Sequence, residues 1–267
     1  MPCIRASAQR RRESGQVPPF IAWVLARAGL CPEAYRSETL QRRVSACLRL
    51  LRVTSDDSAR ELVERSPELL PGVLCTALIG VSEFFRDRPV FEHLENALLP
   101  ELLATRRGLR VCGVGVSGGQ EIYSMAMLLA EAGALADSTL LGIDCRTNAV
   151  RKAQSGLFTP AEMTGVDEMR RERFFRWAGD SWEVSSVLKA RIRWVARDVL
   201  QMQPGESWDL MLFRNVSIYL TPAHSNKAWS LVCDQVAPGG FLITGKVEKP
   251  PGFLPLMRVA PSIYKKE

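Results

Sequence analysis

The sequence lacks the features that mark several common classes of protein. No stretch approaches the roughly 18 uninterrupted apolar residues that a membrane-spanning helix needs, and the N-terminus has no apolar signal-peptide core. We therefore expect a cytoplasmic protein without membrane insertion. The seven cysteines are scattered and odd in number, there are two histidines, and no Cys-x-x-Cys pair occurs. Neither a disulfide framework nor a metal site is indicated, and buried free thiols are expected.

Charge is present but unevenly distributed. The chain of 267 residues has a net charge of +6 and is long enough for one large domain or two modest ones. The arginines before Thr54 outnumber the acids there; they are Arg5, Arg10, Arg11, Arg12, Arg27, Arg36, Arg42, Arg43, Arg49 and Arg52, against Glu13, Glu33 and Glu38. A basic front half suggests an acidic partner, nucleic acid included. The alternative is a solvated helix face after a disordered basic tail, residues 1–16.

The stretch Leu109–Met127 is the most informative segment of the sequence. It reads LRVCGVGVSGGQEIYSMAM, a short apolar run, a turn of small residues and then apolar residues at helical spacing. This pattern predicts a strand, a glycine turn and a helix, an arrangement that suits a nucleotide-like ligand. A tight turn without a ligand remains the alternative, because Gly113, Gly115 and Gly118–Gly119 do not have the GxGxxG spacing of a dinucleotide site.

Before this turn the pattern is helical. A small bundle is predicted over residues 17–88, with helices at Phe20–Ala28, Ser37–Leu51, Ala59–Ser66 and Leu69–Ile79. The helix at Ser37–Leu51 has an apolar stripe and a basic outer face. Farther on, Ser82 is a candidate helix cap. Arg86 lies close to the glycine turn, where it is either solvated or part of a site.

After the turn, predicted strands alternate with helices. Strands are expected at Ser138–Asp144, Arg191–Ala196, Trp208–Phe213 and Gly240–Thr244, with helices at Thr147–Ser155 and Pro222–Val236 and short surface strands within Arg176–Val187. This alternation predicts a doubly wound, mainly parallel sheet with its ligand at the carboxyl ends of the strands. Asp144, Asp198 and Asn215 would stand at that edge. Asp144 follows the glycines at about the distance of an acid that binds ribose hydroxyls.

Taken together, these motifs resemble the CheR family, the S-adenosylmethionine-dependent methyltransferases that esterify glutamates of bacterial chemoreceptors. The resemblance runs from about Pro19 to Tyr264. Its motifs are SEFFRD at Ser82–Asp87, SGGQEIYSMAM at Ser117–Met127, GLF at Gly156–Phe158, FRNVSIYL at Phe213–Leu220, PGGFLITG at Pro238–Gly245 and a closing SIYKK.

The resemblance implies a fold and a site. The fold would be α/β: an N-terminal helical domain and then, over residues 89–267, a Rossmann-like class I methyltransferase domain with a small antiparallel β insert near residues 159–190. Its cofactor would be S-adenosylmethionine, with S-adenosylhomocysteine as product. By match to the family motifs, the cofactor contacts would be Ser82, Arg86, Gly113, Gly115, Ser117, Glu121, Asp144, Asp198, Val199, Asn215 and Val216.

The resemblance also implies catalytic and substrate-binding residues. Arg86 and Tyr219 match the positions that the family places beside the reacting methyl group. The basic helix with Arg42, Arg43 and Arg49 matches the one thought to meet the receptor. The expected partner is therefore the cytoplasmic coiled coil of a chemoreceptor or a similar signalling protein, and not nucleic acid. A nucleic-acid methyltransferase is disfavoured because no Asn/Asp-Pro-Pro-Tyr type motif is present.

Several positions depart from the family pattern. Most relatives have asparagine where this chain has Gly80, threonine at Gly118, a second acid at Arg146 and asparagine at Asp198. The GHSE-like ending is here Gly245-Lys246-Val247-Glu248. These departures keep an alternative open, a degenerate relative that binds S-adenosylmethionine or S-adenosylhomocysteine and a coiled-coil partner without turnover.

Overall fold

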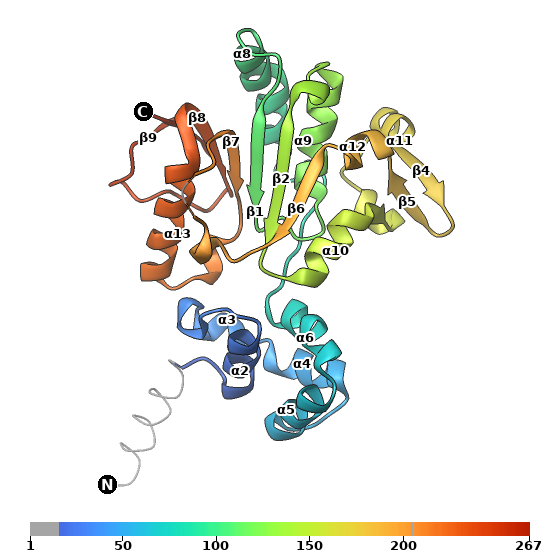
Figure 1. The fold of residues 1–267 in the computed structure, drawn as a ribbon, viewed down its shortest axis with the longest axis vertical. Coiled ribbons are helices and arrows are strands. Elements are labelled where there is room, and N and C mark those ends of the chain that lie inside the picture. Colours follow the sequence, from blue (N-terminus) through green and yellow to red (C-terminus); the bar gives the residue numbers. More distant parts are fainter. Residues whose placement is uncertain (1–15, 204) are drawn as a thin grey trace. The chain divides into compact units, whose positions relative to one another are not determined.

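The computed structural model describes residues 16–203 and 205–267, which form two compact units (Figure 1). The first contains the described chain up to Ile79 together with Ile218–Ser225, and the second contains Gly80–Ser217 and Asn226–Glu267. The sequence motifs placed this division after Arg88, whereas the contacts assign residues 80–88 to the second unit. The predicted basic tail lies outside the described residues except for Gln16. No helix in the described ranges is long and apolar enough to cross a membrane.

The first unit is helical, as the sequence predicts. Its α-helices are α2 (Pro19–Arg27), α3 (Ser37–Gln41), α4 (Val44–Leu51), α5 (Asp56–Arg65) and α6 (Leu70–Ala77), with 3-10 turns at Pro32–Ala34 and Pro67–Leu69. Ser55 caps α5 by accepting a hydrogen bond from the Ser58 N–H. The segment Ile218–Ser225 joins this unit through Leu220, which forms a β-bridge with Tyr35 and whose carbonyl accepts a 2.8 Å hydrogen bond from Arg36 Nε.

The single helix expected at Ser37–Leu51 is wrong, because the chain turns at Arg42 and Arg43 between α3 and α4. Arg43 Nε donates a 3.0 Å hydrogen bond to the carbonyl of Thr76, in the last turn of α6. Carbonyls at a helix C-terminus lack a partner within their own helix, so this contact satisfies one of them. Arg43 and Thr76 are 33 positions apart in the sequence, so the periodicity of apolar residues along a helix could not predict their contact.

A seven-stranded sheet forms the centre of the second unit. The strands are β1 (Arg110–Val114), β2 (Thr139–Asp144), β6 (Ile192–Ala196), β7 (Trp208–Phe213), β8 (Val236–Thr244), β9 (Leu256–Ala260) and β10 (Ile263–Lys266). Their order is β6-β2-β1-β7-β8-β10-β9. The strands from β6 to β8 pair in parallel, and β10 is antiparallel to both of its neighbours.

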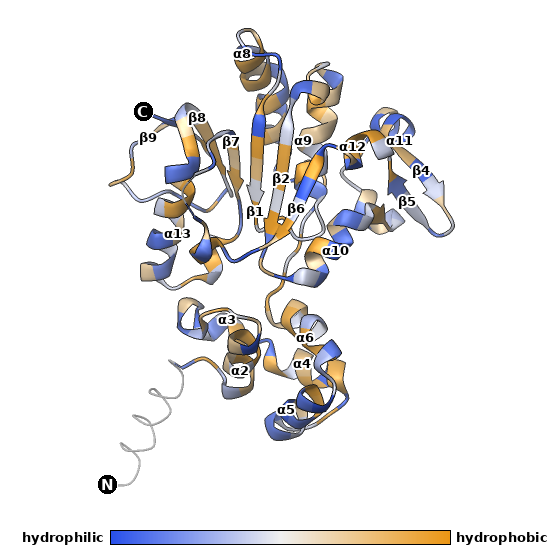
Figure 2. Cartoon of the chain, viewed as in Figure 1, coloured by the Kyte–Doolittle hydropathy of each residue, from blue (hydrophilic) through white to orange (hydrophobic). Residues whose placement is uncertain are grey.

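The strand order reverses at β1, because the chain continues to β2 on one side of it and β7 lies on the other. In doubly wound sheets a ligand binds at the carboxyl ends of the strands beside such a reversal. Apart from its first residue, each of β1 and β2 is buried, and both strands are mostly orange in Figure 2. Continuous burial of this kind is typical of parallel strands covered on both faces. The predicted doubly wound sheet is therefore confirmed.

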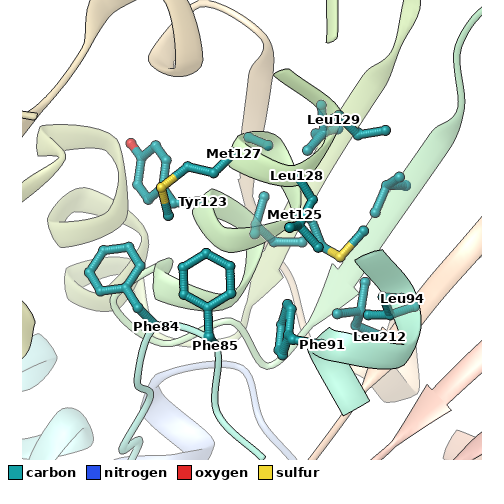
Figure 3. Close-up of a cluster of buried hydrophobic side chains, with 14 of the residues drawn as sticks. Phe84, Phe85, Phe91, Leu94, Tyr123, Met125, Met127, Leu128, Leu129 and Leu212 are labelled. Carbon is teal, nitrogen blue, oxygen red and sulfur yellow. The ribbon is translucent and has the colours of Figure 1, made fainter. Parts of the chain in front are cut away.

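The helices of the second unit include α9 (Gln120–Glu131), α10 (Thr147–Ser155), α7 (Arg88–His93) and α8 (Leu99–Leu103), with a π-helical turn at Leu94–Leu98; α13 (Pro222–Gln235) begins in the first unit. Figure 3 shows Phe84 and Phe85 in one buried cluster with side chains of α9 such as Tyr123. The Phe84 ring packs edge-on against Phe158, with centroids 4.9 Å apart. The expected helix cap at Ser82 is wrong, since the next helix, α7, begins only at Arg88 and Ser82 lies in the loop anchored by these rings.

Two smaller elements complete this unit. The β insert is a three-stranded antiparallel sheet in the order β3-β5-β4, formed by β3 (Leu157–Phe158), β4 (Phe175–Ala178) and β5 (Ser181–Val184), together with α11 (Glu168–Phe174), α12 (Ser186–Lys189) and a 3-10 turn at Pro160–Met163. The hairpin of β9 and β10 is not among the elements that the sequence predicts. Strand β9 has no buried residue and only five positions, so its pattern does not stand out.

Candidate functional site

The glycine turn after β1 is held against the ends of two neighbouring strands. The N–H groups of Gly115 and Val116 donate to the carbonyl of Ile143, at 2.7 and 3.1 Å. Gly115 has a φ of +75°, and a Cβ atom there would lie 2.2 Å from Cγ2 of Val216, in the loop after β7. Glycine is therefore required both for the backbone conformation and for this close approach. The sequence-predicted residues Gly115, Ser117, Asp144 and Val216 meet at one edge of the sheet.

Asp144 ends β2, and its carboxylate is fully engaged within the protein. Its side chain is 2% exposed. Oδ2 accepts hydrogen bonds from the Ser117 N–H and from Nη2 of Arg146, each at 2.9 Å. Oδ1 accepts from the backbone N–H and from Nε of Arg146, also at 2.9 Å. A carboxylate offers about four acceptor positions, so four donors occupy all of them.

The guanidinium of Arg146 lies against Gly80. A Cβ atom on Gly80 would be 2.2 Å from Nη2 of Arg146 and 2.6 Å from its central carbon. The carbonyl of Gly80 in turn accepts a 3.0 Å hydrogen bond from the Ser117 hydroxyl. In the sequence, Gly80 and Arg146 are two separate departures from the family pattern. In the structure the space left by one residue is occupied by the other.

The thiol beside this ion pair is held protonated. Burial, reinforced by the adjacent Asp144 carboxylate, raises the pKa of Cys145 to about 12. Since the thiolate is the reactive form of cysteine, this thiol is inert near neutral pH. Cys145 is therefore not a nucleophile.

A second buried arginine, Arg214 at the end of β7, ties the SEFFRD loop to the site. Its side chain is 1% exposed and donates to Glu121 Oε1 and Asp87 Oδ2, each at 2.7 Å. It also donates to the carbonyl of Arg86 at 2.9 Å. Burial by itself would lower the pKa of Arg214, but the two carboxylates outweigh it and the pKa is raised. Charge-assisted bonds of this kind are strong, so Arg214 fixes the backbone of Arg86 relative to α9.

The side chain of Arg86 is half-buried, and its Nη1 donates a 3.0 Å hydrogen bond to the carbonyl of Val81. Arg86 also lines a cavity of 510 Å³ together with Phe85, Phe91, Glu95, Val166 and Arg170. Arg170 is already committed there, because it pairs with Glu95 at 2.6 Å and with Glu131 at 2.8 Å. Arg86 pairs with no carboxylate in the described part of the chain, which leaves its charge available for a bound anion.

Glu248 holds the loop after β7. Its carboxylate is 5% exposed and accepts hydrogen bonds from the N–H of Val216 at 3.1 Å, of Ser217 at 2.9 Å, of Gly245 at 3.2 Å, and of Asn215. The Ser217 hydroxyl donates to it as well, at 2.6 Å. Asn215 has a φ of +58°, uncommon for a non-glycine residue. Sequence reasoning assigned Glu248 no role, although its place at the end of a family motif was the available signal.

Two further groups complete the carboxyl edge. Asp198, after β6, is 7% exposed and accepts a 3.1 Å hydrogen bond from the Leu200 N–H. Gln120, the first residue of α9, is 4% exposed, and its Oε1 has no hydrogen-bond partner among the described residues. A Cβ atom on Gly118 would lie 2.8 Å from this oxygen. Buried acceptors are rarely left unpaired, so the oxygen marks a place for a donor from a ligand or water; sequence reasoning missed it.

Other sequence-predicted residues are not brought together by this geometry. Tyr219 belongs to the first unit, where its carbonyl accepts a 2.9 Å hydrogen bond from the Arg36 N–H, whereas Arg86 belongs to the second. Their meeting at a reacting methyl group stays a prediction. Arg42 and Arg49 are exposed in the first unit. Within residues 16–203 and 205–267, no group of three or more His, Cys, Asp or Glu side chains is placed to hold a metal ion.

Comparisons with known proteins agree with this geometry. The family model described as "CheR methyltransferase, SAM binding domain" matches residues 80–259. A chemotaxis protein methyltransferase of Listeria monocytogenes is 28% identical over 223 residues, covering 83% of this chain and 85% of the relative. That of Vibrio anguillarum is 27% identical over 241 residues, covering 85% and 87%. Chemotaxis protein methyltransferase 1 of Vibrio cholerae is 25% identical over 261 residues, covering 92% and 94%.

The family match begins at Gly80, which is also the first residue of the second unit, and it includes the glycine turn, Asp144 and Asp198, and the loop after β7. The expected fold, family and cofactor are thereby confirmed. The chain belongs to the CheR methyltransferase family, and its cofactor is S-adenosylmethionine.

Proposed function

We propose that this protein is an O-methyltransferase that esterifies glutamate side chains of a chemoreceptor or receptor-like signalling protein in the cytoplasm. The observation that carries the proposal is the buried Arg214, which ties the Arg86 loop to Glu121 at the start of α9, beside the glycine turn. Arg86 pairs with no carboxylate among the described residues, so it is suited to receive the carboxylate of a substrate. The relatives named chemotaxis protein methyltransferases support the same reading.

The residues at the carboxyl edge fit the cofactor in all but one respect. In this proposal Asp144 binds the ribose and Asp198 and Val199 contact the adenine, and the unpaired Oε1 of Gln120 can accept from a donor group of the cofactor. Ser82, Gly113, Glu121 and Asn215 remain the further proposed contacts. The exception is Asp144, whose acceptor positions are all filled by the protein itself.

For this methyl transfer, the main task of the protein is to align the cofactor with the substrate carboxylate. The cofactor supplies a methyl group on a sulfonium, and an ionised glutamate is already a nucleophile, so no general base is required. Arg86 orients the substrate carboxylate by paired hydrogen bonds, which Nε and Nη2 can donate while Nη1 stays on the Val81 carbonyl. The Tyr219 hydroxyl positions the carboxylate or the cofactor. Rate enhancement then comes from orientation and from exclusion of water.

The substrate surface in this proposal is the basic face of α3 and α4. Arg42 and Arg49 are exposed there, as is Arg52 at the end of α4. Arg43 is less available to a partner, because its Nε donates a hydrogen bond to the Thr76 carbonyl. A coiled coil that carries glutamates to be methylated is acidic, so the two surfaces complement each other in charge.

The proposal is tested by incubating the protein with methyl-labelled cofactor and the purified cytoplasmic parts of receptors encoded near its gene. We expect label on glutamate that is released as methanol at alkaline pH, because a methyl ester is base-labile whereas an N-methyl group is not. Arg86→Ala should abolish labelling. Arg88→Ala, which removes a neighbouring arginine paired with Glu92 on the surface, should not. Base-stable label, or label unaffected by Arg86→Ala, would refute the proposal.

A second candidate function is a non-catalytic relative that binds the cofactor or its product together with a coiled-coil partner. The pair between Arg146 and Asp144 favours it, because competition for the ribose-binding carboxylate weakens the cofactor complex that methyl transfer requires. Calorimetry with S-adenosylhomocysteine, alongside the labelling assay, separates the two. Tight binding of the nucleoside and of a receptor fragment, without any methyl transfer, supports the second candidate.

A further inference from the structure

We propose that Arg146 is an internal latch on the ribose-binding carboxylate, and that it must release Asp144 before the cofactor can bind. The inference rests on the proposed placement of the cofactor ribose at Asp144, and it does not depend on the identity of the methyl acceptor. The latch makes the apparent affinity for the cofactor weaker than the pocket could give. Gly80 is the residue that allows the latch to close.

The first argument is the arrangement of donors on the carboxylate. Two of the four hydrogen bonds come from backbone N–H groups, of Ser117 to Oδ2 and of Arg146 to Oδ1, which the turns after β1 and β2 fix in place. The other two come from the guanidinium, with Nε on Oδ1 and Nη2 on Oδ2. Withdrawing the guanidinium therefore frees one acceptor position on each oxygen. Two adjacent ribose hydroxyls need such a pair of positions.

The second argument is burial. The side chains of Arg146 and Asp144 are only 8% and 2% exposed, so the pair is shielded from water and from screening by salt. A bidentate pair between a guanidinium and a carboxylate is among the stronger hydrogen-bonded contacts in proteins. The ribose must displace it, and the apparent dissociation constant equals the intrinsic one divided by the fraction of molecules with the latch open.

The third argument is the space at Gly80. An added Cβ would lie within 2.6 Å of three atoms of the guanidinium, namely Nη1, Nη2 and the central carbon. The Ser117 hydroxyl holds the Gly80 carbonyl at 3.0 Å, so the backbone is pinned where the guanidinium needs the room. Any side chain at position 80 would push the far end of Arg146 away from Asp144. Residues 80 and 146 are therefore energetically coupled.

The test is titration calorimetry with S-adenosylhomocysteine on four full-length proteins: the wild type, Arg146→Ala, Gly80→Ala and the control Arg151→Ala. Arg151 is exposed on α10, the helix that begins directly after Arg146. Among the described contacts it donates a hydrogen bond only to Asn148. We expect at least a tenfold tighter dissociation constant for Arg146→Ala. Gly80→Ala should also tighten binding, although it leaves the charge unchanged. The control should match the wild type.

A double-mutant cycle and a stability measurement complete the test. In an Asp144→Asn background, Arg146→Ala should no longer tighten binding, because the acceptor that the latch guards has changed. Without ligand, Arg146→Ala should unfold at a lower temperature than the wild type, since a buried carboxylate has lost its partner. Saturating S-adenosylhomocysteine should then raise its melting temperature by more than it raises that of the wild type.

Unchanged or weaker binding in both Arg146→Ala and Gly80→Ala would overturn the proposal, and Gly80→Ala decides alone if the other variant does not fold. Tighter wild-type binding of adenosine 2′,5′-bisphosphate than of S-adenosylhomocysteine, lost in Arg146→Ala, would also overturn it by making Arg146 an anion receptor. The readout is nucleoside binding without a receptor. If the variants bind the nucleoside as expected but the wild type methylates no receptor, the proposed function is refuted and the proposal for Arg146 stands.

Discussion

The carboxylate of Glu248 accepts two hydrogen bonds from Ser217, one from its N–H at 2.9 Å and one from its hydroxyl at 2.6 Å. The same carboxylate binds the N–H groups of Asn215 and Val216, so a single side chain sets the course of the loop after β7. That loop touches the glycine turn at Gly115. Glu248 thus shapes the edge of the cofactor site without a proposed contact of its own to the cofactor.

Glu248→Gln should weaken S-adenosylhomocysteine binding at least tenfold. The amide keeps the shape of the side chain, but it turns one acceptor oxygen into an NH₂ group that faces backbone donors. Each buried donor left unpaired costs about 1–3 kcal/mol, so the unfolding free energy should fall as well. Calorimetry and thermal unfolding measure the two effects, and the exposed neighbour Lys249→Gln is the control. Wild-type affinity in Glu248→Gln would show that the loop is held by other contacts.

Asp144→Asn should weaken S-adenosylhomocysteine binding about tenfold, to a level that calorimetry still measures, and should also lower stability. The sequence placed Asp144 at the carboxyl edge of the sheet, and the structure shows its side chain buried there and paired with Arg146. Removing one partner of a buried ion pair costs roughly 3 kcal/mol or more. Urea unfolding would measure the loss, and calorimetry the binding. Wild-type affinity in a folded Asp144→Asn protein would remove this carboxylate from the cofactor site.

Arg214→Lys should lower the rate of methyl transfer about tenfold or more. Lysine keeps the positive charge between Glu121 and Asp87 but lacks the planar fork that also reaches the Arg86 carbonyl. We expect kcat to fall because the Arg86 loop is no longer fixed relative to α9. The measurement is steady-state labelling of a receptor fragment, with circular dichroism to show that the variant is folded. An unchanged kcat would mean that the aromatic anchors hold the loop without Arg214.

Arg49→Glu should lower kcat/KM for an intact receptor several-fold at low salt, with unchanged affinity for S-adenosylhomocysteine. Arg49 is exposed on α4, and reversing its charge opposes the acidic substrate surface. Arg65→Glu on α5 changes the net charge equally at a residue whose side chain is 79% exposed, and it serves as control. The difference between the two variants should shrink as salt is added. Equal effects of both would remove α4 from the substrate interface.

Glu162 should give a stability contribution that is lost in acid. Burial alone would raise its pKa, but the Thr159 N–H and Lys152 outweigh it, so the pKa lies below the usual value. A depressed folded-state pKa stabilises the fold above the unfolded-state pKa of about 4.3, and the contribution disappears as the pH falls through the folded value. The melting temperature of Glu162→Gln should therefore lie below that of the wild type at pH 7 and equal it at pH 2.5. A gap of the same size at both pH values would contradict this.

Much of the fold could be predicted because its signals are local. The strand at Trp208–Phe213 and the helix at Thr147–Ser155 have the predicted bounds, since each segment is delimited by polar or turn residues. The break between α3 and α4 could not be predicted, because it accompanies a hydrogen bond from Arg43 to Thr76, far along the chain. Strand β9 could not be predicted either, because it is an exposed edge strand that is defined by its hydrogen bonds to β10.

For the candidate site, the sequence by itself determined which residues stand at the carboxyl edge. Glycine turns and acids at strand ends are local patterns, and parallel strands bring them to one place. Only the tertiary structure decided what those residues contact. The pairs of Arg146 with Asp144 and of Arg214 with Glu121 depend on side chains that converge after folding, in a space that Gly80 leaves open in the first case. Ion pairs depend on how close two charged groups lie in the folded protein. The types and spacing of residues in the sequence therefore identified Arg146 as unusual, but they could not show that it pairs with Asp144.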